Sequence, residues 1–148
     1  DIWIDSNKLE QLAIVPFSMA DATAATEKDT GLDFTTGMTI MPFTAVDVRT
    51  VDSGKTIDFG LLSSESGGDA DGFVAAASVA TAAVVQAKCA ATATLGALLR
   101  ETVVADAGTA SVRHSYTVGA TAVSLTYTIS SGSTTAAGYM RIPYTLKF

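Results

Sequence analysis

The fold class is decided by two segments near the end of the chain, Val123-Ser-Leu-Thr-Tyr-Thr-Ile129 and Tyr139-Met-Arg-Ile-Pro-Tyr-Thr-Leu-Lys-Phe148. Apolar and polar side chains alternate in both, and β-branched and aromatic residues are frequent, which is typical of half-buried strands. Small polar residues separate the segments, so the pair predicts an antiparallel hairpin with a long tip. Pro143 cannot donate to a sheet ladder, and we therefore expect the last strand to be an edge, or bulged, at that residue.

Strand-like patterns recur along the rest of the chain, at residues 11–19, 38–51, 55–62, 101–105 and 111–118. Asp52-Ser-Gly54 is a turn that predicts hairpin pairing between the second and third of these. Residues 73–83 are rich in Ala and follow Asp71, which predicts a short helical insert. The sequence thus predicts a mainly β fold, an antiparallel β-sandwich, jelly roll or barrel with one helical insert at about 73–83.

Length and composition limit the classes of function. The 148 residues predict a single domain, and the net charge of −6 with only nine scattered Lys and Arg argues against nucleic acid as a partner. The longest apolar run, residues 73–85, is too short to span a bilayer, so we expect no membrane partner. Cys89 is the only cysteine, which excludes an intramolecular disulfide and a thiolate metal site.

Residues 63–72 form an acidic, glycine-rich segment. Asp69 and Asp71 match inner ligand positions of an EF-hand loop, but the first and last ligands are missing. A different calcium site could use the carboxylates of Glu65, Asp69 and Asp71. We favour a solvated acidic turn over this site and expect no cofactor.

His114 is the only histidine, and it lies in a strand-like segment. No Gly-x-Ser-x-Gly motif accompanies it, and no glycine-rich phosphate loop or paired metal ligands occur. We therefore expect a protein that is not an enzyme, with a hydrolase built around His114 as a minor alternative.

Three segments are candidates for contact with other proteins. Residues 1–10, with Trp3 and Ile4, could form a docking arm, because chain ends are loose unless something holds them. Residues 20–37, which include Phe34, read as a long surface loop. Tyr139, Arg141 and Pro143 share the polar face of the last strand, and Tyr and Arg are common interface anchors.

Two stretches resemble the decoration, or cement, proteins of tailed bacteriophages. One is Asp47-Val-Arg-Thr-Val-Asp-Ser-Gly-Lys-Thr-Ile-Asp-Phe-Gly60 with the acidic segment 67–73 behind it, and the other runs from Thr126 to Tyr144. The composition, rich in Ala, Thr, Ser and Gly and poor in Cys, is also similar.

The resemblance implies a β-rich, non-enzymatic virion protein on the outer capsid surface, where it stabilises the junctions between capsomers. Its partners would be the major capsid protein and further copies of itself, as a homotrimer. The sequence leaves a second class open, a ligand- or glycan-binding β-sandwich of the tail-fibre or adhesin type. Exposed aromatic residues would favour that class, but aromatic residues are only 7% of the chain.

Overall fold

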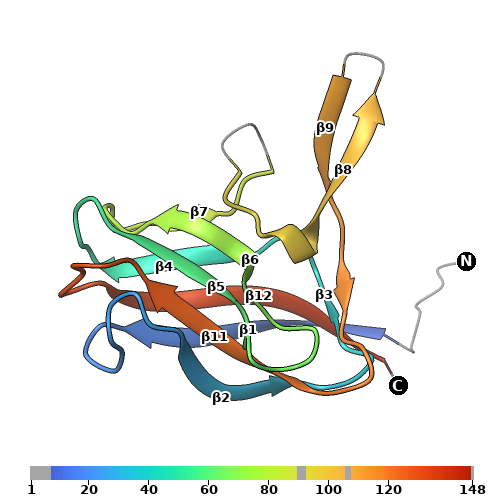
Figure 1. The fold of residues 1–148 in the computed structure, drawn as a ribbon, viewed down its shortest axis with the longest axis horizontal. Coiled ribbons are helices and arrows are strands. Elements are labelled where there is room, and N and C mark those ends of the chain that lie inside the picture. Colours follow the sequence, from blue (N-terminus) through green and yellow to red (C-terminus); the bar gives the residue numbers. More distant parts are fainter. Residues whose placement is uncertain (1–7, 90–92, 106–107, 148) are drawn as a thin grey trace, which may run out of the picture.

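The computed structural model describes residues 8–89, 93–105 and 108–147, and nearly all of its regular structure is β (Figure 1). A 3₁₀ turn, η1 (Ala97–Leu99), is the single helical element of these residues. The strands are β1 (Lys8–Ser18), β2 (Lys28–Phe34), β3 (Thr39–Ile40), β4 (Ala45–Thr50), β5 (Thr56–Leu61), β6 (Asp69–Ser78), β7 (Val84–Gln86), β8 (Arg100–Ala105), β9 (Gly108–Arg113), β10 (Tyr116–Thr117), β11 (Val123–Ile129) and β12 (Ala137–Lys147).

Two antiparallel sheets form the body of the molecule. The six-stranded sheet has β12 between β1 on one side and β3 and β4 on the other, with β7 beyond β4 and β10 beyond β3. The four-stranded sheet has the order β2-β11-β5-β6. The main order β1-β12-β4-β7 facing β2-β11-β5-β6 is that of a jelly roll, one of the three architectures predicted from the sequence.

The core lies between the two sheets and draws large side chains from both. Phe17 on β1 meets Tyr127 on β11 edge to face at 6.2 Å, and Phe34 on β2 meets Phe73 on β6 at 6.0 Å. Met140 and Ile142 of β12 are fully buried, on the face that the alternation predicts.

The two predicted hairpins are wrong, although their strands are correct. β11 pairs with β2 and β5, whereas β12 pairs with β1, β3 and β4 in the opposite sheet. The turn at Asp52 likewise leads from β4 in one sheet to β5 in the other. In a jelly roll these connections cross between sheets, and local alternation carries no information about which strands pair.

The predicted helix at 73–83 is also wrong. Residues up to Ser78 belong to β6, and Phe73, Val74 and Ala77 enter the core. Ala76 has a left-handed φ of 51°, and its N–H donates to Asp58 Oδ1 at 2.6 Å, so the strand is bulged there. Helix propensity is a weak preference, and pairing with β5 overrides it.

The predicted loop 20–37 is partly a strand. β2 occupies residues 28–34 and pairs with β11, with a bulge around the left-handed Gly31. Charged residues and Gly obscure the alternation in this segment.

β12 is not an edge strand at Pro143, and its register with β1 runs through Pro143 without a shift, so neither the predicted edge nor the predicted bulge is present. Pro143 lies where the neighbour of β12 changes from β4 to β3. Its C=O accepts from Met41 N–H at 2.8 Å on that side, so its missing N–H faces the break between the two short strands.

Candidate interaction surfaces

The outer face of the six-stranded sheet carries an exposed apolar surface. The β1–β12 register sets Leu12 beside Pro143, Ile14 beside Arg141 and Pro16 beside Tyr139. Ile14 is 56% exposed, Leu12 45% and Tyr139 39%. We name this surface the Tyr139 face; its members are Leu12, Ile14, Pro16, Val84, Tyr139, Arg141 and Pro143.

A charged pair borders the aromatic ring of this face. The Arg49 guanidinium donates to both carboxylate oxygens of Asp47 at 2.8 Å and lies 5.7 Å from the centre of the Tyr139 ring. The hydrogen bonds from Arg49 lower the pKa of Asp47, and the positive charge of Arg141 acts in the same direction. The Tyr139 face therefore combines apolar side chains with an arginine, Arg49, that Asp47 holds beside an aromatic ring, which is a common composition of protein interfaces.

The predicted interface residues lie in different environments. Tyr139, Arg141 and Pro143 lie together on the outer face, as their shared parity predicts. Phe34 does not qualify, because it is 1% exposed and packs in the core against Phe73. Trp3 and Ile4 lie outside the described residues.

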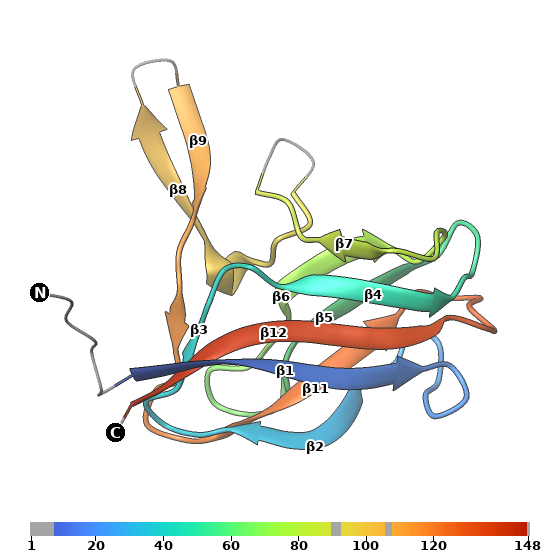
Figure 2. The ribbon, with the colours of Figure 1, turned by 180° about the vertical axis from the view of Figure 1, so that it is seen from behind.

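A second surface is the hairpin of β8 and β9, here called the arm. It is distinct from the docking arm that the sequence predicts at residues 1–10. It forms a two-stranded sheet of its own, and both views show it standing away from the sandwich (Figures 1 and 2). Five of its described side chains are uncharged: Thr102, Val103, Ala110, Ser111 and Val112. The exposed Glu101 lies opposite Val112. Val112 is 40% exposed. The described part of the arm thus offers a β surface of few charges, and neither of its strands pairs with a described strand of the sandwich.

The base of the arm is fixed by hydrogen bonds to the body. The Arg113 guanidinium donates to Pro42 O and, at 2.8 Å, to Ala87 O, and it lies 5.4 Å from the centre of the Phe43 ring. His114 N–H donates to Leu99 O at 3.0 Å, and Leu99 is fully buried. The orientation of the arm is therefore set where it leaves the sandwich.

The ring nitrogens of His114 contact other residues at the base of the arm. Its Nε2 lies 2.9 Å from Leu98 O, and its Nδ1 lies 3.8 Å from Glu101 Oε2. These contacts join the residue after β9 to η1 and to the start of β8, which is a positioning role at the base of the arm.

The calcium candidates are not assembled into a site. Glu65 instead accepts from the Ser124 N–H and hydroxyl, each at 3.2 Å. Asp69 and Asp71 are neighbours, and burial together with the Asp71 carboxyl raises the pKa of Asp69. Within the part of the chain that the structure describes, no three His, Cys, Asp or Glu side chains are grouped as metal ligands.

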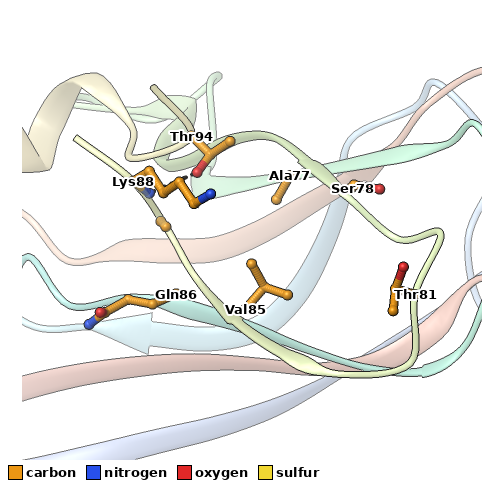
Figure 3. Close-up of a pocket in the computed structure, with 8 residues that line it drawn as sticks. Ala77, Ser78, Thr81, Val85, Gln86, Lys88 and Thr94 are labelled. Carbon is orange, nitrogen blue, oxygen red and sulfur yellow. Dashed lines mark hydrogen bonds between the residues drawn. The ribbon is translucent and has the colours of Figure 1, made fainter. Parts of the chain in front are cut away.

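A pocket of about 300 Å³ opens between the end of β6 and β7 (Figure 3). Its walls are small apolar and polar side chains: Ala77, Ser78, Thr81, Val85, Gln86, Ala87, Lys88 and Thr94. The Lys88 N–H donates to Thr94 Oγ1 at 2.8 Å and so braces one wall. No lining residue is aromatic, so the pocket offers no ring for a sugar to stack on.

Comparison of the chain with protein-family models, with curated proteins and with solved structures gives no match. None of the described helical structure is both long and apolar enough to cross a membrane.

Sequence reasoning missed most of the Tyr139 face and the separation of the arm. Leu12 and Ile14 join the face only through the β1–β12 register, which alternation does not reveal. For the arm, the available signal was the shortage of large apolar residues between Thr102 and Val112, since such a hairpin has little to bury.

Proposed function

We propose that the chain is a non-enzymatic structural protein of a virion, which binds the outer surface of a tailed-phage capsid and stabilises the junctions between capsomers. The observation that carries this proposal is the arm, a β-hairpin with a fixed base that stands away from the sandwich. An isolated two-stranded hairpin is marginally stable in water. A partner surface that covers the arm would therefore stabilise it, and the major capsid protein is the partner that we propose.

The fold and the charge support the same conclusion. Jelly rolls occur in viral capsid and lectin domains, which is an analogy of fold and not of site. The two stretches that resemble cement proteins favour the capsid over the lectin. A net charge of −6 suits a position outside the shell, away from packaged DNA. The resemblance also implies a homotrimer, which stays a prediction.

The test is co-sedimentation of the purified chain with mature capsids stripped of their accessory proteins. We expect saturable binding at a fixed ratio to the major capsid protein. Val112→Asp places a charge on the arm and should weaken this binding at least tenfold. Leu32→Asp is the matched control, because Leu32 is similarly exposed at 38% but lies on β2. No binding by the unmodified chain would overturn the function, and equal binding by both variants would overturn the role of the arm.

The pocket beside β7 favours one other function, the binding of a small, largely apolar ligand. Because its lining lacks aromatic residues, we do not extend this alternative to glycans. Thermal shift and calorimetric titration with a library of small apolar acids, whose carboxylates could meet Lys88, would test it. Binding that Ala77→Leu abolishes by filling the pocket would support it, and no heat with any member would remove it.

A further inference from the structure

The free edge of β1 is the feature that carries a further inference. Among the described residues, β1 pairs with β12 alone. Met19 N–H donates to Ala136 O at 2.9 Å and continues that ladder, whereas the Ser18 N–H and C=O both contact the Tyr127 hydroxyl. Successive residues of a strand direct their main-chain groups to opposite sides. The N–H and C=O groups of Leu12 and Ile14 therefore point away from β12.

The main-chain groups of Pro16 point to the same side as those of Leu12 and Ile14. Its missing N–H therefore lies on the free edge and removes no hydrogen bond to β12. Between Glu10 and Ser18 the strand carries no charged side chain. The side chains of Leu12 and Ile14 are about half exposed beside this edge.

The other long edges of the two main sheets are protected by charges or by a bulge. β2 carries Lys28, Asp29 and Asp33, and β6 is bulged at Ala76. Charges and bulges are the usual means by which proteins prevent pairing at sheet edges. The third edge, β7, is only three residues long. β1 is the longest edge strand of the two main sheets, and from Gln11 to Phe17 it has no charge and no bulge, with Pro16 as its one protecting residue. This segment is thus the edge of the sandwich most suited to pairing.

We propose that β1 pairs antiparallel with β1 of a second copy of this chain, about a two-fold axis that passes through Ala13. In this register Leu12 of each copy lies opposite Ile14 of the other, so the free N–H and C=O groups bond across the axis. Glu10 lies opposite Pro16, which places the missing N–H near the end of the paired segment.

A second copy of this chain is the partner that best fits the free edge of β1. The segment from Leu12 to Ile14 is self-complementary when reversed, and a two-fold contact uses the same patch on both copies. The Leu12 and Ile14 side chains of the two copies form one apolar cluster on the outer face. That cluster is continuous with Tyr139 and Pro143, so the two Tyr139 faces become one surface.

This pairing neither uses the arm nor requires a capsid, so it goes beyond the proposed function and can fail or hold separately. Its first test is sedimentation velocity and light scattering from micromolar to millimolar concentration. We expect a dimer, with twice the chain mass of 15.1 kDa, in place of the homotrimer that the resemblance implies. Ile14→Lys should weaken the dimer at least tenfold, because it sets a charge on each side of the axis. The control Leu32→Lys should not change the dimer.

Disulfide trapping tests the register. In a Cys89→Ser background, an equal mixture of Leu12→Cys and Ile14→Cys chains should form a mixed disulfide dimer, because opposed hydrogen-bonded residues have Cα atoms about 5.5 Å apart. Disulfides only between like variants would overturn the Ala13 axis. A monomer at every concentration, or a trimer that Ile14→Lys leaves intact, would overturn the pairing itself. Circular dichroism of each variant confirms that the strand has folded.

Discussion

The hydroxyl of Ser133 donates to Asp52 Oδ2 at 2.7 Å, and so joins the β11–β12 connection to the β4–β5 connection at one end of the sandwich. The N–H groups of Thr134 and Thr135 donate to the same oxygen at 2.9 and 3.3 Å. Both connections cross between the sheets. One carboxylate therefore holds together two connections between the sheets that lie far apart in the sequence.

These bonds predict how stability depends on pH. The hydrogen bond from Ser133, followed by that from Thr134, lowers the pKa of Asp52 in the folded state. A lowered pKa gives stability that is present above the unfolded pKa of about 3.9 and is lost as pH falls through the folded pKa. We expect Asp52→Ala to lower Tm at neutral pH, with a difference from the unmodified chain that shrinks under acid conditions.

Thermal unfolding monitored by circular dichroism over the acid range measures this difference. Asp21→Ala is the control, since it removes an equal charge from another loop. A Tm difference for Asp52→Ala that is constant with pH would contradict the assignment.

For Asp58 we predict the opposite dependence of stability on pH. Burial raises the pKa of Asp58, against the hydrogen bond that it accepts from Ala76 N–H, and the charge of Asp71 raises it further. The folded state then holds the proton more tightly than the unfolded state, so this group makes the protein more stable as pH falls through the folded pKa. Asp58→Asn keeps an acceptor for Ala76 and should raise Tm at neutral pH. An unchanged or lowered Tm would show that the charge contributes favourably to the bulge.

Gly138 is predicted to tolerate no side chain. A Cβ at this position would overlap the Asp47 carbonyl oxygen and would lie 3.1 Å from the Phe17 ring. We expect Gly138→Ala to cost about 1–3 kcal/mol of unfolding free energy, as overpacked cores do. Gly119→Ala is the matched control, because nothing lies within 4 Å of its Cβ position, and it should change stability by less than about 0.5 kcal/mol. Urea titration of the two variants compares them directly.

Arg113 is predicted to control the stability of the arm and not that of the body. Arg113→Lys keeps the charge but cannot bond both Pro42 O and Ala87 O in the same way. Loss of a charge-assisted hydrogen bond of about 1.5 kcal/mol corresponds to about tenfold faster local amide exchange in β8 and β9. The matched control is Arg100→Lys, at the opposed position of β8. Equal exchange in both variants would show that Arg113 does not hold the base.

The alternation of apolar and polar residues gave correct predictions where these depended on a single strand. It placed Met140 and Ile142 inside and Tyr139 and Arg141 outside, because the side-chain direction in a strand depends only on parity. The prediction from Ala content failed at Ala76, where a polar side chain on the neighbouring strand accepts a hydrogen bond from a backbone N–H and the strand bulges.

The candidate surfaces were recovered only in part for a related reason. Tyr139, Arg141 and Pro143 follow from one strand, whereas Leu12 and Ile14 lie beside them through pairing between residues more than a hundred positions apart in the chain. Phe34 was misplaced because β2 was not recognised as a strand, so its buried terminal position was not visible.

The central place of β12 has a consequence for folding. β12 pairs with β1, more than a hundred positions away in the chain, and it is also the long neighbour of β4 on that side. The six-stranded layer therefore closes only through contacts of high sequence separation, which form slowly. We expect chains truncated before Ala137 to leave both β1 and β4 exposed, and so to be bound by chaperones and cut by proteases.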